Sequence, residues 1–516
     1  MKIKLLISCI ILLLSTTTMA QSRFTVSGKV TDTRGESLPG ATILEAGTTN
    51  GVITDIEGSF SINVASNQSI IKISFIGYHS VELTAGSVGP VIVLESEVSS
   101  LEEVVVVGYG TVRRKDVTGS VVSINESSLN EGPVTNPLQQ ISGKAAGVVV
   151  TQTGSEPGSA PSIRIRGITS LIGGSNPLVV IDGMQGNLDL LNQLSPDEIE
   201  SIDILKDASA TAIYGSRGAP GVILITTRKS KAGSSQIEVN SSTSLDMISR
   251  KLDMLTADEW RQQRALWGVP VSTDHGSDTD WYGLLTRNGT TQNHSIAIGG
   301  GTNDFNYRAS VATILQNGIV INSDNQNYIG RLQASQKAID GKLEISASVS
   351  ASTRENTGSP SSIGRAAFTS NLISNTYVSR PTDPVLNRDG SYFTDPAVFQ
   401  YLNPYAVANT VVNKNTTNNL FGTLRADLDL FKGFRVSWFG SWRKLDGNSG
   451  YYLPAISTLS SAIDNKGIAN INNWHEDEKL TDVTLNYKAL VGDHSLDAIA
   501  VYEWQKQSYN GNFSQM

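Results

Sequence analysis

The stretch "LFGTLRADLDLFKGFRVSWFGSW", residues 420 to 442, alternates apolar and polar side chains on both sides of a short turn. The apolar positions are Leu424, Ala426, Leu428 and Leu430 before the turn, and Phe434, Val436, Trp438 and Trp442 after it. Lys432 and Gly433 supply the turn, because glycine adopts positive φ without strain. A period of two predicts a β-hairpin with one apolar and one polar face.

The same alternation recurs from about residue 236 to residue 516. We predict about eight strands there, near residues 294–299, 305–314, 328–334, 343–351, 420–430, 434–442, 483–490 and 496–504. Several of these reach about ten residues, which is enough to cross a bilayer as tilted strands. Soluble β-sandwiches alternate as well, so periodicity alone leaves two architectures open, an outer-membrane barrel and a secreted array of β-sandwiches.

The first twenty residues, "MKIKLLISCIILLLSTTTMA", predict a secretory signal peptide. Lys2 and Lys4 precede an apolar run, and Ala20 ends a segment of small residues that suits cleavage before Gln21. Cys9 lies inside the apolar run and not at its end, which argues against a lipoprotein site. Export with strand-rich periodicity favours a mainly β protein of the envelope or the exterior.

Charge and cysteine content exclude several classes of function. The formal charge is −8 and becomes −10 when the two lysines of the signal peptide leave, so nucleic acid is a poor partner. Cys9 is the only cysteine, so the mature chain has no disulfide and no cysteine metal site. No later apolar run approaches the ~18 residues that a membrane helix needs.

Residues 21 to 95 form a first block of short alternating strands separated by turn sequences such as "TRGESLPG" and "DIEGSF". This spacing predicts a small β-sandwich. The segments "GKVTDTRGESLPGATI", "TDIEGSFSI" and "IGYHSVEL" resemble the carboxypeptidase-regulatory-like domain. The resemblance implies a folded accessory module without an active site of its own.

Residues 96 to 118 predict a linker with a strand-forming centre, "EEVVVVGYG", at residues 102 to 110. Four consecutive valines are usually a buried core strand. Here they lie between two blocks that each look complete, with charged residues on both sides. We therefore interpret them as a strand without a sheet of its own, suited to pairing with the sheet edge of another protein.

Residues 119 to 230 predict a mixed α/β unit. "LQQISGKAAGVVVTQTG" passes from a short helix to a strand, and "PSIRIRG", "PLVVIDG" and "VILITTRK" read as further strands. In "SPDEIESIDILKD", Ser195 is a predicted N-cap, Pro196 the first helical residue and Glu198 the partner in a capping box. "ASATAIYGSRGAPG" predicts a short helix that Gly215 ends.

Long, ordered motifs then identify a family. "EEVVVVGYGT", "ISGKAAGVVVTQTGSEPGSAPSIRIRG", "PLVVIDG" and "ESIDILKDASATAIYGSRGAPGVILITTRK" resemble the TonB box and plug of the SusC/RagA family of TonB-dependent outer-membrane transporters. "TDW" at 279 to 281 and "TQNHSIAIGGGTNDFNYRASVATILQNGIV" extend the resemblance into the barrel. It implies a fold with an N-terminal β-sandwich, an α/β plug, and the first strands of an antiparallel 22-stranded transmembrane β-barrel within 231–516.

Two features depart from the family pattern. Pro220 stands where the family usually has asparagine, and proline removes a backbone donor beside a strand. Residues 236 to 516 are also too few for 22 strands of about 9 to 11 residues each. We therefore expect this sequence to be the N-terminal portion of a longer protein with an incomplete barrel.

The resemblance implies partners, a location and a coupling segment. The TonB box would comprise Glu103, Val104, Val105, Val106, Val107, Gly108, Tyr109 and Gly110. It would bind TonB, which acts with ExbB and ExbD, while a SusD-like outer-membrane lipoprotein would cover the barrel and capture an oligosaccharide or a peptide. The barrel would span the outer membrane of a Gram-negative cell, with the N-terminal domain in the periplasm.

Enzymatic and metal-dependent functions find little support. His79, His275, His294, His475 and His494 show no metal-ligand spacing, and "HEDE" at 475 to 478 predicts a solvated acidic loop. Asp274, Asp278 and Asp280 lack the pattern of a calcium-binding loop and predict a polar turn. Arg164 and Arg166 alternate with isoleucines and suit salt bridges inside the plug better than substrate contacts. We expect no catalytic residues, metal or cofactor.

Two other functions stay open at this point. A secreted adhesion or binding protein built of β-modules would be soluble without detergent. A signal-transducing TonB-dependent receptor would bind an inner-membrane partner through its N-terminal extension. No second exported domain precedes the carboxypeptidase-like module, so signalling ranks behind nutrient uptake.

Overall fold

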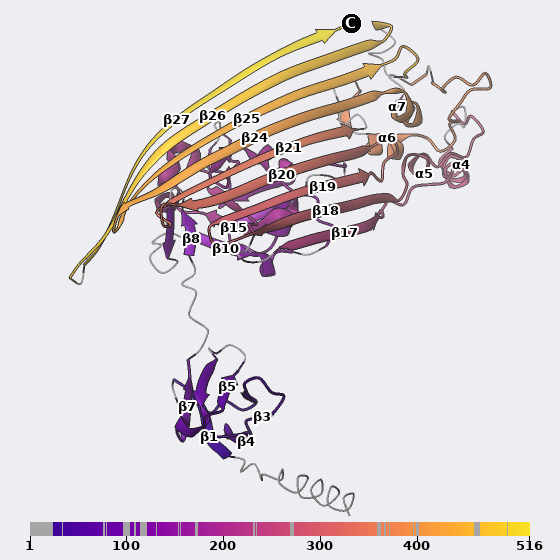
Figure 1. The fold of residues 1–516 in the computed structure, drawn as a ribbon. Coiled ribbons are helices and arrows are strands. Elements are labelled where there is room, and N and C mark those ends of the chain that lie inside the picture. Colours follow the sequence, from indigo (N-terminus) through magenta and orange to yellow (C-terminus); the bar gives the residue numbers. More distant parts are fainter. Residues whose placement is uncertain are drawn as a thin grey trace, which may run out of the picture. The chain divides into compact units, whose positions relative to one another are not determined.

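The computed structural model describes most of the 516 residues, and its strands and helices are labelled in Figure 1. The described residues are 24–33, 35–75, 78, 80–95, 104–107, 110–113, 121–130, 132–152, 154, 156–170, 174–230, 233, 235–268, 273–358, 363–365, 368–370, 372–395, 397–398, 402–458, 465–492 and 494–516. The predicted signal peptide and part of the predicted TonB box, Glu103, Gly108 and Tyr109, lie outside this part of the chain. The chain divides into two compact units at Val104 and Val105, and each is described by itself.

The first unit is a two-sheet β domain. A three-stranded sheet has the order β4-β1-β7 and a four-stranded sheet the order β3-β2-β5-β6. The strands are β1 (Phe24–Asp32), β2 (Thr42–Glu45), β3 (Gly51–Ile53), β4 (Ser59–Val64), β5 (Ile70–Ser74), β6 (Val81–Thr84) and β7 (Val91–Leu94). Alternate residues such as Ile71 and Ile73 are fully buried in one core between the sheets, as the predicted sandwich requires.

An α/β subdomain opens the second unit. Its five-stranded sheet has the order β10-β15-β16-β13-β14, and β11 pairs with β12 in a separate ladder. The elements are β10 (Val121–Asn125), α2 (Pro137–Gln140), β11 (Val148–Thr151), β12 (Ser162–Ile165), β13 (Leu178–Ile181), β14 (Met184–Gly186), β15 (Ile199–Leu205), α3 (Ala208–Thr211) and β16 (Val222–Thr227). Val179 and Ile181 enter one core cluster while Leu178 and Val180 enter another, so β13 is buried on both faces.

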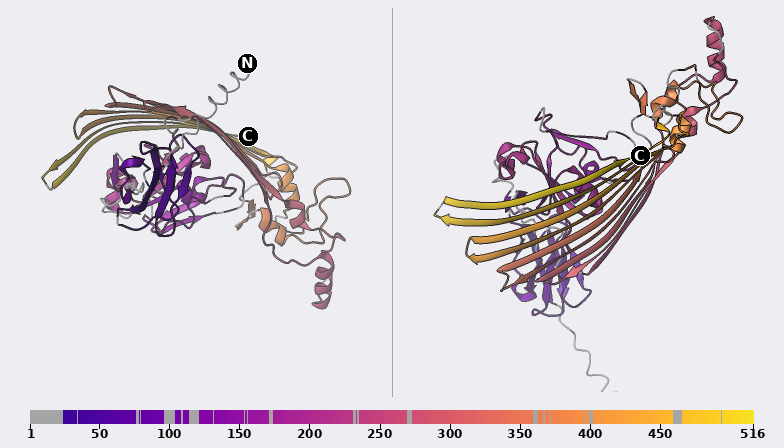
Figure 2. Two further views of the ribbon diagram at one scale, coloured as in Figure 1. Left: turned by 60° about the horizontal axis from the view of Figure 1, so that its bottom comes forward. Right: turned by 90° about the horizontal axis from the view of Figure 1, so that it is seen from above.

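Nine antiparallel strands in sequential order form the largest sheet of the second unit, which we call the strand wall. They are β17 (Gln236–Asp246), β18 (Gly289–Gly301), β19 (Phe305–Asn317), β20 (Asp324–Ala338), β21 (Leu343–Thr357), β24 (Val412–Phe431), β25 (Phe434–Leu453), β26 (Ile468–Val491) and β27 (His494–Gln515). Figure 2 shows that the wall is strongly curved, and the α/β subdomain lies against its concave face. The mainly β fold class is thereby confirmed.

The two ends of the strand wall differ. At one end the chain turns tightly, as at Gly433, whose φ is 84°, between β24 and β25. At the other end lie the longer connections, with α4 (Ala257–Leu266), α5 (Trp281–Leu285), α6 (Leu372–Val378), α7 (Pro404–Thr410) and the short pair β22 (Ile363–Arg365) and β23 (Phe368–Ser370). In Figure 1 the helices α4 to α7 all gather at that end. We call the segments 247–288 and 358–411 the loop end of the wall.

Three local predictions are wrong. "SPDEIESIDILKD" forms a single 3-10 turn, Pro196–Glu198, followed by β15 and not by a helix, and Ser195 makes no side-chain cap. The "HEDE" segment lies inside β26 and is not a loop. The predicted strands all exist but most are longer than expected, and β17 was missed.

None of the helices in the described residues is both long and apolar enough to cross a membrane.

Candidate functional site

The predicted coupling segment coincides with a strand, β8 (Val104–Val107), which is hydrogen-bonded to β9 (Gly110–Arg113) in a two-stranded sheet. The interpretation of Val104–Val107 as a strand without a sheet of its own is therefore wrong in one respect, since β9 pairs with it. No third strand joins β8 or β9 within the described residues. Two strands alone are at best marginally stable in water, so this sheet gains stability from a further strand.

The α/β subdomain meets the strand wall through ion pairs, and the first, which is buried, centres on Arg308 of β19. Its guanidinium donates to Glu198 Oε1 at 2.9 Å and to Glu238 Oε2 of β17 at 2.9 Å, and the Arg308 side chain is only 5% exposed. Arg228 extends the cluster to Glu126 at 2.8 Å and to Glu238 at 3.6 Å. Glu198, the predicted capping residue, thus serves instead as a long-range ion-pair partner.

A second ion pair joins Arg331 of β20 to Asp182, in the turn between β13 and β14. Asp182 has φ 49° and is followed by Gly183 with φ 93°, so the turn aims the carboxylate at the wall. Asp182 also accepts hydrogen bonds from the Thr227 amide at 3.0 Å and the Thr227 hydroxyl at 2.7 Å. Because one of the two partners belongs to the wall, separating the subdomain from the wall breaks the pair.

The third contact joins the subdomain to β27. Arg217 forms an ion pair with Glu503 at 3.0 Å, and Gln185 donates to the same carboxylate at 2.7 Å. Arg217 also contacts Gln505 and donates to Gln185 Oε1 at 2.6 Å. Burial raises the pKa of the nearby Tyr214 phenol, and the negative charge of Glu503 adds to the rise.

Hydrogen bonds, most of them between uncharged groups, hold the subdomain toward the loop end of the wall. Side chains on four wall strands contact the subdomain: Ser295 with Asp197 at 2.6 Å, Asn293 with the Val134 carbonyl at 2.9 Å, Asn327 with the Asn192 carbonyl at 2.9 Å, Gln316 with the Gly158 amide at 3.0 Å and Asn356 with the Pro157 carbonyl at 2.8 Å. Arg354 also contacts the Gly158 carbonyl. Phe421 packs into the subdomain core and Phe439 lies against Gly183, so two aromatic side chains accompany the polar contacts of this interface.

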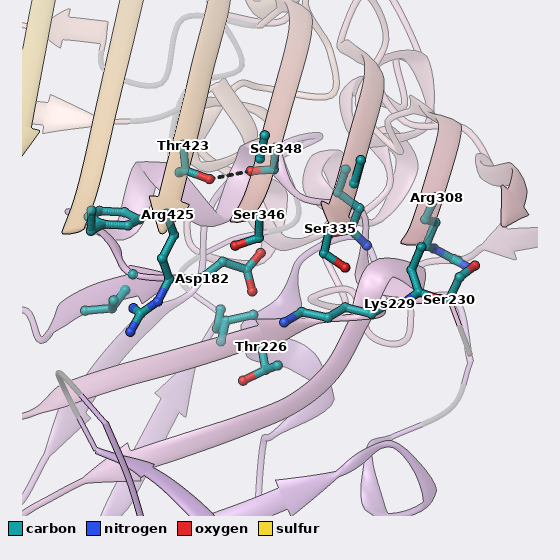
Figure 3. A pocket seen from close by; sticks show the side chains of 18 of the residues that line it. Asp182, Thr226, Lys229, Ser230, Arg308, Ser335, Ser346, Ser348, Thr423 and Arg425 are labelled. Carbon is teal, nitrogen blue, oxygen red and sulfur yellow. Dashed lines mark hydrogen bonds between the residues drawn. The ribbon is translucent and has the colours of Figure 1, made fainter. Parts of the chain in front are cut away.

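A cavity of about 300 Å³ separates part of the subdomain from the wall. Figure 3 shows Asp182, Thr226 and Lys229 of the subdomain facing side chains of the wall across it. The wall contributes hydroxyl groups from Ser335, Ser346, Ser348 and Thr423, of which the last two lie 2.7 Å apart. Apolar side chains such as Val180, Leu224 and Phe439 line the cavity as well, so its surface is of mixed polarity.

The other residues singled out from the sequence serve local structure. Arg166 pairs with Asp207 inside the subdomain, while Arg164 donates to Asn176 at 2.6 Å. Asp274 binds Arg261 at 2.7 Å, and Asp280 caps α5 by accepting from the Gly283 amide at 2.9 Å. In the described part of the chain, no group of three or more histidine, cysteine or acidic side chains is arranged to hold a metal.

The site residues whose role the sequence analysis missed include Asp182, Glu198, Arg308 and Arg331. Each arginine keeps the alternation of a strand that is easy to recognise, and each lies on the more polar face, which is turned to the subdomain. A charged side chain at an inward position was the available signal. Its partner was not readable, because the partners lie more than 100 residues away.

Comparison with models of known families identifies the first β domain and the α/β subdomain. Residues 26–106 match the model of the CarboxypepD_reg-like domain, and residues 113–222 match that of the TonB-dependent receptor plug domain. The α/β subdomain is therefore a plug domain of the kind found in TonB-dependent receptors, and ion pairs seat it against a curved antiparallel wall.

Similar proteins make this comparison more specific. The chain is 30% identical to TonB-dependent receptor P3 of Formosa agariphila over 99% of its own length and 51% of the relative. It is 36% identical to TonB-dependent receptor SusC of Bacteroides thetaiotaomicron over 74% of its length and 38% of that protein. The RagAB peptide importer in the open-open state has the same fold, with a TM-score of 0.69 at 23% identity, over 80% of this chain and 50% of that one. The chain is thus similar to TonB-dependent receptors that include SusC, and it spans about half the length of P3 and 38% of the length of SusC.

Proposed function

We propose that this protein is an active transporter of the outer membrane that imports oligosaccharides or peptides. The observation that carries the proposal is the polar interface between plug and wall, where ion pairs at Arg308, Arg331 and Arg217 hold the plug in place. Side-chain ion pairs can break and re-form without unfolding either partner. A plug held in this way closes the barrel at rest and can be displaced during transport.

The energy for displacement would come from TonB, acting with ExbB and ExbD, through residues 103 to 110. Adding a TonB strand to the two-stranded sheet of β8 and β9 would supply the third strand that this sheet lacks. Main-chain hydrogen bonds would give affinity with little demand on side chains, which suits the valine run. Force on β8 would then act on the plug, which follows it in the chain.

The lengths of the connections between the wall strands predict which end of the wall faces the periplasm. Outer-membrane barrels have short periplasmic turns and longer extracellular loops. The tight turns, such as that at Gly433, would therefore face the periplasm together with the N-terminal domain, and the loop end would face the exterior. A SusD-like lipoprotein would bind there. Exposed apolar side chains at the loop end, Leu252, Met254, Leu255, Leu266 and Trp267, offer surface for it.

Replacing residues 103–109 of the transporter by an equal length of glycine and serine tests the coupling role. We expect loss of growth on the imported oligosaccharides or peptides, with normal insertion in the outer membrane, because the plug keeps its ion pairs but cannot be pulled. The same replacement at residues 96–100, in the same linker, is the matched control and should transport normally. Uptake that persists at the wild-type rate in the first variant would exclude residues 103–109 as the coupling segment.

A further inference from the structure

The outward face of β24 to β27 can be assigned residue by residue. Phe421 and Glu503 contact the plug, so their side chains point inward. Residues paired across antiparallel strands share a face, and sequence neighbours point to opposite faces. The inward row that contains Phe421 continues through Arg443, Glu478 and Gln507 without a register shift.

A band of apolar and aromatic side chains covers this outward face. It comprises Leu420, Leu424, Trp438, Trp442, Val483, Leu485, Tyr487, Leu496, Tyr502 and Trp504, each between 37% and 71% exposed. Aromatic residues at the margin of such a band mark the interface between membrane and water in transmembrane barrels. Trp442 and Trp504 lie toward the loop end of the band.

Two lysines lie at this margin directly opposite one another. Lys479 pairs with Trp442 on one side and with Lys506 on the other, and both lysines are exposed. Neither ammonium has an ion-pair partner among the residues that the structure describes. Like charges directly opposite on one face of a sheet destabilise it, so this pair gains from a bound anion.

The neighbouring carboxylates on the outward face are already engaged. Nε2 of His475 lies 2.7 Å from Oδ2 of Asp477, and Nδ1 of His475 lies 2.7 Å from Oδ1 of Asp446. Asp446 also lies 3.6 Å from the ammonium of Lys444. The positive charge of Lys479 and Lys506 is therefore not neutralised by an ion pair with either acid.

We propose that Lys479 and Lys506 bind the phosphate group of a lipid in the outer leaflet. This inference rests on the proposed function, because the lysines reach headgroup level only if the wall spans the membrane with its loop end outside. A phosphate group carries the charge that the pair lacks, and the band with Trp442 and Trp504 contacts the acyl chains below it. The strands continue beyond the lysines with polar outward residues such as Asn448, Asn473 and Asn512, which suit contact with sugars or water.

Native mass spectrometry of the transporter purified in detergent tests the site. The probe is a monophosphorylated lipid A, compared with the same lipid after removal of its phosphate. We expect the double variant K479A/K506A to bind the phosphorylated probe roughly 30-fold more weakly, at about fivefold per lysine. The double variant K479R/K506R should bind like the wild type, because the charge is retained.

The matched control is K337A/K342A, which removes two exposed lysines at the opposite end of the same wall and should leave binding unchanged. Heat-dependent mobility on gels confirms that each variant is folded. Equal binding of the dephosphorylated lipid, unchanged binding by K479A/K506A, or full competition by excess inorganic phosphate would each overturn the proposal. Uptake measurements separate the two hypotheses. If K479A/K506A loses lipid binding but keeps normal uptake, the lipid site is supported independently of transport. If the wild type binds the lipid but takes up no substrate, the result counts against the transport function alone.

Discussion

Glu198 and Arg308 join plug and wall at a distance of 110 residues along the chain. Both side chains are about 5% exposed, so their charges have lost most of their contact with water. Such burial is tolerated only because each charge has a partner. Arg308 keeps a second partner in Glu238, which stays in place whenever the plug moves, since Glu238 and Arg308 both belong to the wall.

Replacing Glu198 by glutamine should loosen the plug without exposing an unpaired arginine. We expect the opening free energy of β15 to fall by about 1.5–3 kcal/mol, the value of a hydrogen bond to a charged group. Amide hydrogen exchange across Ile199–Leu205 in the detergent-solubilised transporter measures this, with exchange roughly 10- to 150-fold faster.

Glu200→Gln provides the control for that experiment. Glu200 lies two residues after Glu198, near the start of β15, but its side chain is exposed and has no ion-pair partner among the described residues. Its exchange should match the wild type. Equal protection in the two variants would mean that the Glu198–Arg308 pair does not hold the plug.

The roles of single residues were the least predictable part of the sequence. Ser195, Pro196 and Glu198 fit a helix N-terminus, yet β15 pairs with β10 and β16 and overrides that local preference. The alternation of the strands was readable because it depends only on neighbours in the chain. The ion-pair partner of Arg308 could not be predicted, because it depends on how two separate sheets meet.

At the scale of elements, α4 is held to the following loop by one arginine. Arg261 Nε donates to Asp274 at 2.7 Å, and another guanidinium nitrogen donates to the Ser277 carbonyl at 2.8 Å. The hydrogen bond from Arg261 lowers the pKa of the Asp274 carboxyl below its usual value. Much of α4 is exposed, and this pair ties the helix to the loop that follows it.

A lowered pKa in the folded state means that the pair stabilises α4 at pH values above the unfolded pKa of about 3.9. That contribution is lost as the pH falls through the lower folded-state pKa. We therefore expect pepsin cleavage within 257–268 of the purified transporter to accelerate as the pH is lowered below about 3.9. In the variant Asp274→Asn, cleavage should already be fast above that pH. Identical pH profiles for wild type and variant would rule out this role for the pair.

The number of strands in the wall was predicted better than their lengths. β24 to β27 have 20 to 24 residues, whereas the apolar alternation covers only about half of that. The remainder is polar on both faces, as in "NKNTTNN" of β24, so no period marks it. β17 was missed because Ser241 and Thr243 interrupt the alternation of Ile237 and Val239.

At the scale of the whole molecule, the proposal requires that the plug moves relative to the wall. Cross-linking the two tests this in a chain whose only cysteine lies in the predicted signal peptide. Asp197 of the plug and Ser295 of β18 are in hydrogen-bond contact at 2.6 Å, which places cysteines at these positions within reach of a short thiol cross-linker. The pair Asp197→Cys and Ser295→Cys should stop uptake when cross-linked with a reducible reagent and recover it on reduction.

The outcome also distinguishes two ways of opening. The Asp197–Ser295 contact is neighboured by the Glu198–Arg308 ion pair, so a cross-link there fixes the same part of the plug that this ion pair holds. If the plug leaves as one body, the cross-link blocks transport completely. If only the Asp182 or Arg217 side of the plug rearranges, uptake continues despite quantitative cross-linking. Each single cysteine variant, treated with the same reagent, should transport normally, because an attachment at one end leaves the plug free.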